Sequence, residues 1–221
     1  MTTQAGSRPL PAGLIRDLPL DPIQRDGHFS IENRRSLPGI ADADYRIISP
    51  GYFRALSVPL LRGRDFTESD TAGAPGAAII SEEMARRYFP GRDPVGERIW
   101  FDSFEPKEHW LTIVGIVKDV RQRGLTAPVA PAAYVCYTQV RPGYLSSSQL
   151  VVRTSLEPMS LAPSLRSRIR TVGRETAVSF DSMDKVLDTA LSPGLSSASA
   201  HGLRSARVGA GCSGTISDVH L

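Results

Sequence analysis

Apolar and polar positions are most clearly ordered between residues 77 and 101, where the sequence reads AAIISEEMARRYFPGRDPVGERIWF. Residues 77–80 are an apolar run after a segment rich in glycine and proline, which predicts a strand. Ser81 stands where a helix N-cap belongs, and the two glutamates behind it suit the positive end of a helix dipole. A proline–glycine pair predicts the end of the helix, and residues 97–101 predict the next strand.

The rest of the chain alternates short strand patterns with short helix patterns. Apolar runs predict further strands at 13–20, 26–33, 45–48, 60–66, 110–120, 132–138, 149–154 and 177–180. Apolar residues at helical spacing predict helices at 51–56, 161–172 and 183–191, with Ser49 and Ser182 as N-caps. The run WLTIVGIVKDV at 110–120 is dense in β-branched residues, so we expect a central strand with Ile113 and Val117 buried.

These elements predict an α+β fold, because short helices and mostly separate strands follow one another along the chain. The composition changes after Leu191. Residues 192–221 are mostly serine, alanine and glycine, and they lack the apolar area that would offset the entropy cost of ordering. We therefore expect a disordered tail from 192 to 221.

Composition is that of an ordinary globular protein of one or two domains, with 221 residues, 41% hydrophobic and 22% charged. The net charge is +3, and only Lys107, Lys118 and Lys185 are lysines among 26 basic residues. We interpret this arginine bias as a coding preference and expect no nucleic-acid partner. No stretch approaches the ~20 apolar residues that span a bilayer, so we expect no direct membrane insertion by this chain and no secretory signal in it.

No residue pattern predicts catalysis, a cofactor or a metal. The four histidines lack the spacing of metal ligands; they are His28, His109, His201 and His220. Cys136 lies in an apolar run, which indicates a buried thiol, and Cys212 is too distant to suggest a disulfide framework. The pair Glu82 and Glu83 suits the helix dipole, and we attribute Asp42 and Asp44 to solvation in a loop. We therefore expect a protein that is not an enzyme.

Six arginines could bind an anionic partner, although a solvated face is the simpler interpretation. They are Arg62, Arg64, Arg86, Arg87, Arg121 and Arg123.

Four stretches, taken together, resemble the MacB-like periplasmic core domain of FtsX-like ABC transporter permeases: residues 43–70, 77–99, 111–125 and 132–137. The strings SPGYF, ARRYFPGRDPVGERI and VGIVKDVRQRGL carry the resemblance, because they are long and occur in the family's order and spacing. The resemblance runs from about residue 18 to residue 191.

The resemblance implies a two-lobed mixed α/β core domain at residues 14–191. Residues 14–48 and 147–191 would form the first lobe, and residues 49–140 a second lobe inserted in it. The family implies a non-catalytic role on the extracytoplasmic face of the cell membrane. A separate cytoplasmic ATPase subunit would move the permease's transmembrane segments, and the domain would transmit that movement to substrate or partner.

The sequence departs from the family at both ends, because transmembrane helices would flank the domain in relatives. We therefore expect a truncated or frameshifted chain. The alternative is a free-standing soluble binding or interaction module for a peptide, a lipid or a partner protein. Neighbouring reading frames would distinguish the two, since only the permease hypothesis predicts missing membrane segments and an ATPase gene nearby.

Overall fold

The computed structural model describes residues 10–20, 25–34, 41–104, 109–145, 148–172 and 178–191, so the expected tail at 192–221 lies outside the described residues. Within these ranges the chain forms nine strands and four α-helices. The strands are β1 Ala12–Ile15, β2 Asp26–Ile31, β3 Asp42–Ile48, β4 Leu60–Gly63, β5 Ala77–Ser81, β6 Arg98–Phe101, β7 Leu111–Val117, β8 Ala132–Cys136 and β9 Gln149–Val152. The helices are α1 Tyr52–Leu56, α2 Glu82–Tyr88, α3 Ala162–Val172 and α4 Met183–Leu191.

All nine strands belong to one sheet, in the order β2-β6-β7-β5-β8-β3-β1-β9, with β4 paired to β7. Strand β2 also pairs with β3, so six strands, β2, β6, β7, β5, β8 and β3, close into a ring. The pairs β3–β8 and β5–β7 are parallel. The ring takes strands from both sides of the expected lobe boundary at residue 49, and the division into two lobes stays a prediction.

Two apolar clusters form the core, one on each face of the ring's strands. Inside the ring lie alternate residues of all six strands, including Phe29, Tyr45 and Ile113, together with Met84 and Tyr88 of α2. The outer faces of β3, β5 and β8 form the second cluster, which α1, β1 and β9 cover. Strand β7 is central as predicted, because Ile113 and Val117 are both fully buried.

The predicted unit at 77–101 is confirmed. Helix α2 begins at its predicted cap, where the Ser81 hydroxyl accepts a hydrogen bond from the Met84 N–H at 3.2 Å. The same oxygen accepts the Ala132 N–H at 3.0 Å, which joins the helix cap to the start of β8.

Replacing Ser81 by alanine is expected to lower the free energy of unfolding by about 1–2 kcal/mol, because it removes a cap and leaves a second buried N–H unpaired. Chemical denaturation measures this loss. Ser69→Ala is the matched control, because Ser69 is exposed and should change stability by less than about 0.5 kcal/mol. An equal effect of the two substitutions would contradict the double role of Ser81.

Three sequence predictions are wrong. Ser49 does not cap α1, since the N-cap is Gly51 without a side-chain hydrogen bond. Asp42 and Asp44 are not in a loop, since both lie in β3 and Asp44 is fully buried. Residues 178–180 are irregular rather than part of a strand; residue 177 lies outside the described residues.

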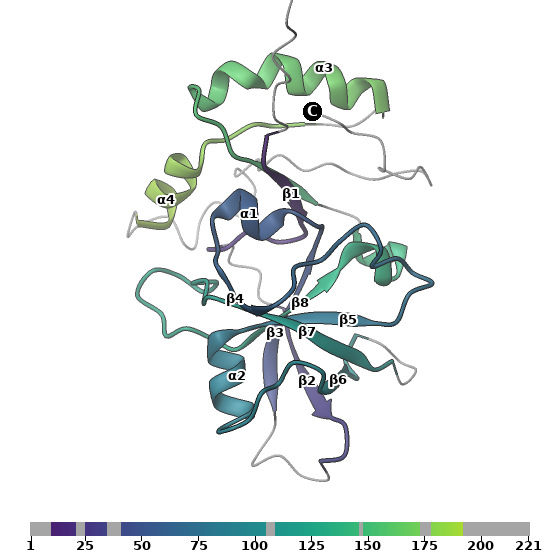
Figure 1. The fold of residues 1–221 in the computed structure, drawn as a ribbon. Helices are drawn as coiled ribbons and strands as arrows, with labels where there is room; N and C mark the ends of the chain where they lie inside the picture. Colours follow the sequence, from purple (N-terminus) through teal and green to yellow (C-terminus); the bar gives the residue numbers. More distant parts are fainter. Residues whose placement is uncertain are drawn as a thin grey trace, which may run out of the picture.

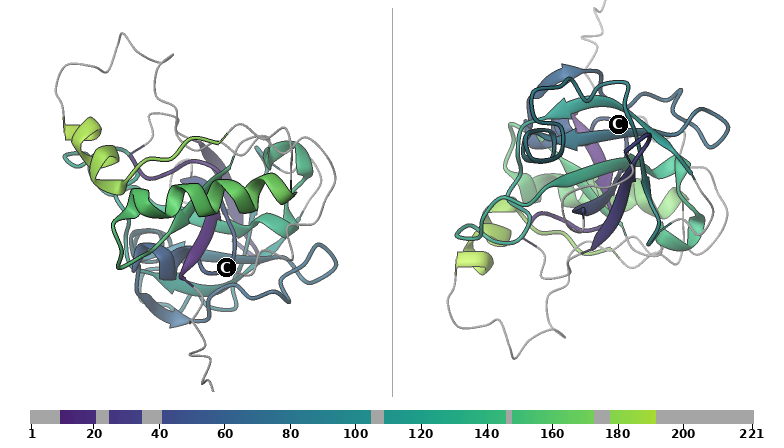
Figure 2. Two further views of the ribbon diagram at one scale, coloured as in Figure 1. Left: turned by 90° about the horizontal axis from the view of Figure 1, so that it is seen from above. Right: turned by 90° about the horizontal axis from the view of Figure 1, so that it is seen from below.

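Helices α3 and α4 lie at the end of the molecule opposite β2 and β6 (Figure 1). Viewed from above, α3 crosses over β1 (Figure 2). Ser182 begins α4 as predicted, because its hydroxyl accepts the Lys185 N–H at 3.3 Å. The apolar face of α4 is largely exposed, with Met183, Leu187 and Leu191 at 38%, 36% and 61% of full exposure.

Candidate functional site: the junction between β1 and α1

The segment SPGYF, residues 49–53, joins the ring to the ribbon formed by β1 and β9. Gly13 of β1 touches the start of α1 so closely that a Cβ atom there would lie 2.3 Å from the Tyr52 Cα. Gly51 adopts φ +84°, a conformation that favours glycine, and a Cβ at this position would lie 2.6 Å from the Ala12 carbonyl oxygen. Two glycines therefore permit a backbone-to-backbone contact between strand and helix.

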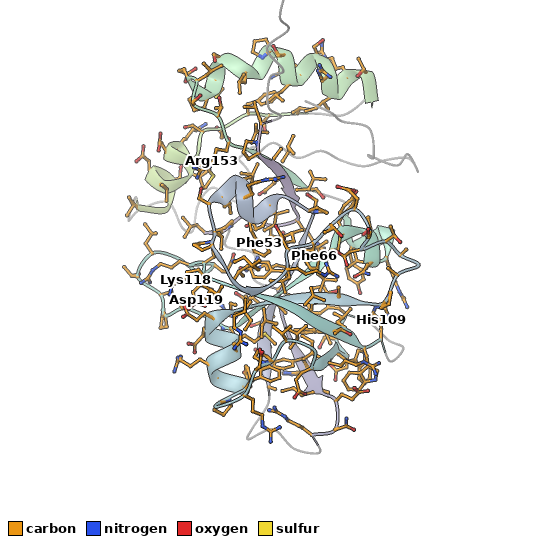
Figure 3. The ribbon with its side chains drawn as sticks, in the orientation of Figure 1. Phe53, Phe66, His109, Lys118, Asp119 and Arg153 are labelled. Carbon is orange, nitrogen blue, oxygen red and sulfur yellow. The ribbon has the colours of Figure 1, made fainter. Side chains whose placement is uncertain are left out.

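Hydrogen bonds fix the same contact. The Leu14 N–H donates to the Ser49 hydroxyl at 2.8 Å, and the Ser49 N–H donates to the Leu14 carbonyl at 2.9 Å. From β9's end of the ribbon, the Arg153 Nε donates to the Ala55 carbonyl at 3.0 Å. Arg153 lies beside α1 in Figure 3. The pairing of Ile15 with Ile48, and the hydrogen bond from the Arg16 N–H to the Ile47 carbonyl at 3.1 Å, add to these contacts between ribbon and ring.

The aromatic residues of SPGYF anchor α1 in the second core cluster. Tyr52 is fully buried and Phe53 is 3% exposed. The Phe53 ring meets the Tyr134 ring of β8 edge-on, with centroids 4.8 Å apart. Phe66 belongs to the same cluster, and Figure 3 shows Phe53 and Phe66 in the region between α1 and the sheet. Phe53 therefore places α1 in direct contact with β8.

A buried charged cluster lies on the same side of the sheet. Asp44 and Arg46 project from one face of β3, are 0% and 1% exposed, and form an ion pair at 3.5 Å. Arg123, in the segment between β7 and β8, reaches Asp44 at 2.8 Å and Asp26 at 3.3 Å. Because charges are costly to bury unpaired, this cluster holds the β7–β8 segment in one position against β3.

Two tyrosines extend the polar cluster. The Gln122 side-chain amide donates to the Tyr134 hydroxyl at 3.2 Å. Burial raises the pKa of Tyr134 to about 12 and raises the pKa of Tyr52 well above its ordinary value. Both hydroxyls therefore stay protonated at any physiological pH, which suits a structural role better than proton transfer.

The VGIVKDVRQRGL segment has a second contact at the start of α2. The Asp119 carboxylate accepts the Glu83 N–H at 2.8 Å, and Lys118 pairs with Glu82 at 2.6 Å. Figure 3 shows Lys118 and Asp119 side by side near α2. Burial is the largest influence on Asp119 and raises its pKa. This segment thus ties β7 to both α2 and β3.

The six arginines do not form one anion-binding face, because five of them contact oxygens of this chain. Arg64 holds Asp70 with two hydrogen bonds of 2.8 Å, and the side-chain hydrogen bond from Arg64 lowers the pKa of Asp70. Arg62 binds Asp93, and Arg86 binds Glu83. Arg121 donates to the Leu125 and Ala127 carbonyls, and Arg123 binds Asp44. Arg87 lies over the Tyr88 ring, 5.6 Å from its centroid.

The structure also locates the other residues considered for chemistry. His28 and His109 are exposed, and Cys136 is a buried free thiol whose pKa burial raises. His201, His220 and Cys212 lie outside the described residues. Within the described ranges, no group of three or more histidine, cysteine or acidic side chains could hold a metal ion. None of the described helices combines the length and apolar composition needed to cross a membrane.

Sequence reasoning missed the residues that build the junction. Gly13 lies in a predicted strand, but the sequence did not indicate its contact partner Tyr52, which is distant in sequence. The sequence around Asp44 and Arg46 does contain a signal for their position. They alternate with apolar residues in ADADYRII, which is the pattern of charges on one face of a strand.

The geometry defines a mixed α/β domain whose fold is similar to the crystal structure of the periplasmic region of MacB from Actinobacillus actinomycetemcomitans. That comparison has a TM-score of 0.51 at 16% identity and covers 76% of this chain and 69% of that one. The family model of the MacB-like periplasmic core domain matches residues 22–172. The chain therefore belongs to this family of extracytoplasmic domains from ABC transporter permeases.

A sequence relative is the uncharacterized ABC transporter permease YknZ of Bacillus subtilis (strain 168). It is 28% identical over 136 residues, which cover 62% of this chain and 31% of that protein. This chain thus spans less than a third of the permease it matches.

Proposed function

We propose that this chain is a non-catalytic relay on the extracytoplasmic face of the cell membrane. In this role it works with the transmembrane segments of an ABC-type permease and with a separate cytoplasmic ATPase subunit. Movement of the membrane helices would reach the chain through α3, α4 and the β1–β9 ribbon. The two-lobe division, with 14–48 and 147–191 around an inserted 49–140, is part of this proposal.

The contact of Gly13 with Tyr52 carries the proposal. The contact joins one backbone to the other, so a displacement of β1 would move α1 without first being absorbed by rotation of flexible side chains. From Tyr52 and Phe53 the path continues into Tyr134 of β8, a strand of the ring. By analogy with permeases of this family, we propose that the movement runs from the membrane to an outer partner. The paired arginines support a mechanical rather than a catalytic use of the charged residues.

A site-specific crosslink tests the assembly. The apolar stripe of α4 should face permease segments, so a photo-crosslinking amino acid at Leu187, in the full chain made by its own host, should capture a membrane-spanning permease polypeptide. Leu60 on β4 is the matched control, since it is similarly exposed but lies on another part of the molecule and should capture none. A soluble chain with no crosslink from Leu187 would favour a free-standing binding module instead.

The relay itself predicts a separation of two activities. Arg153→Ala removes the hydrogen bond from the ribbon to α1, which is worth only about 1 kcal/mol, so the fold should persist. In membranes with the assembled permease and ATPase, we expect transport to fall severalfold while ATP hydrolysis is kept. Arg54→Ala on the exposed side of α1 is the control and should leave both unchanged. Parallel loss of both activities with Arg153→Ala would contradict a relay at this contact.

A further inference from the structure

We propose that the outward face of β2 and β6 binds an acidic segment of a partner protein that also carries an apolar side chain. The chain has two tryptophans, Trp100 and Trp110, and both lie on this face. Their rings are 6.1 Å apart at 60°, and both residues are only half-buried. A tryptophan pair at the surface offers much apolar area at little conformational cost.

The tryptophans border an open hollow. The hollow has a volume of about 370 Å³ and is lined by Ser30, Ile31, Asn33, Arg34, Trp100 and Trp110. A second hollow of about 410 Å³ adjoins it, because Asn33 and Arg34 line both, and Pro90 and Arg92 complete it. Both are open to solvent, whereas small-molecule sites bury most of their ligand. The shape therefore suits an extended segment lying across the surface.

The charges around the two hollows favour an acidic partner. Arg34 donates from Nη1 to the Tyr88 carbonyl at 2.7 Å, but its buried Nη2 has no hydrogen-bond partner among the described residues. Arg92 is exposed and forms no ion pair within the described part of the chain. Arg98 is neutralised by Glu32 at 2.7 Å. Among the described residues, Arg34 and Arg92 thus have no carboxylate partner, and the exposed Arg92 is the more accessible of the two to a partner protein.

A protein segment fits this chemistry because tryptophan and arginine dominate the binding energy of protein interfaces. The guanidinium of Arg98 lies 5.7 Å from the Trp110 ring centroid, which keeps that ring in place for a partner. The face is also at the end of the molecule opposite α3 and α4 (Figure 1). It therefore lies away from the elements that the proposed permease assembly would use, and this inference does not depend on that assembly.

Two-dimensional NMR of the purified full chain tests the proposal, because two tryptophans give two indole N–H signals. The probe is the blocked peptide Glu-Leu-Asp-Phe-Glu, and the control is its neutral analogue Gln-Leu-Asn-Phe-Gln. We expect the acidic peptide to shift both indole signals along a saturable curve that weakens with added salt. The neutral peptide should bind more weakly.

Two charge reversals separate a site from general attraction. Arg92→Glu should weaken the acidic peptide roughly three- to tenfold, since it replaces an attractive exposed charge by a repulsive one. Arg54→Glu makes the same change of net charge on α1, far from this face, and should weaken it less than twofold. Unchanged dispersion of the two indole signals shows that each variant is folded.

Three results would overturn the proposal. The neutral peptide could bind as well as the acidic one, or Arg54→Glu could weaken binding as much as Arg92→Glu. A chitin oligosaccharide could shift the indole signals where the acidic peptide does not, which would assign this face to a glycan.

Discussion

Asp44→Asn is expected to lower the free energy of unfolding by about 3–5 kcal/mol, because removing one partner of a buried ion pair leaves the other charge uncompensated. The carboxylate is fully buried between Arg46 and Arg123, at 3.5 Å and 2.8 Å. Asparagine keeps the shape of the side chain and loses the charge. Arg46, at 1% exposure, would then have no countercharge at this contact. Urea denaturation followed by circular dichroism measures the loss.

Two further variants test whether the loss of stability in Asp44→Asn comes from the buried, unpaired charge. Asp93→Asn removes an exposed partner of Arg62 and should cost no more than about 1 kcal/mol. The double variant Asp44→Leu with Arg46→Met replaces both charges and should be more stable than Asp44→Asn, since a buried apolar pair has no charge to desolvate. If Asp44→Asn costs no more than Asp93→Asn, the buried cluster does not stabilise the fold.

Elements whose signals are local in sequence could be predicted. The unit from β5 to β6 was foreseen almost to the residue, because its strand, cap, dipole charges and proline stop lie within 25 residues. Strand β7 was foreseen as central because β-branched residues fill both of its faces. The strand predicted at 26–33 is present as β2, and its alternating burial places Phe29 and Ile31 on one buried face.

Elements that depend on contacts with distant parts of the sequence could not be predicted. Ser49 has the sequence context of a helix cap, but the Leu14 N–H competes for its hydroxyl from 35 residues away. Residues 178–180 have the composition of a strand, but they form none in the structure. Pairing between β2 and β3 closes the ring. The hydrophobic pattern of a single strand does not indicate which other strand it pairs with, so this closure could not be predicted.

The candidate site also has features that the local sequence predicts and features that depend on distant contacts. SPGYF was recognised as a string, and its aromatic residues could be expected in a core. Its function as the contact with β1 could not be read, because it needs a partner with no side chain, Gly13. A glycine within a strand pattern signals a bulge or a close approach without saying to what.

Gly13→Ala is therefore the sharpest test of the junction, with an expected loss of about 3 kcal/mol, the upper part of the range for overpacking a tight contact. The new methyl group would lie 2.3 Å from the Tyr52 Cα and 2.5 Å from its nitrogen, and neither backbone atom can rotate away. Either β1 or α1 must move. Urea denaturation gives the total loss.

Hydrogen exchange shows which part of the Gly13→Ala variant is destabilised. Exchange of the Leu14 and Ser49 amides should accelerate in Gly13→Ala, because the hydrogen bonds between β1 and residue 49 must lengthen as the two elements separate. Amides of β7, in the ring, should be less affected. Gly73→Ala is the matched control, since nothing lies within 4 Å of a Cβ at that position and its stability should change by less than about 0.5 kcal/mol. Equal stability of the two alanine variants would show that β1 and α1 are not held by their backbones, and the relay would lose its physical basis.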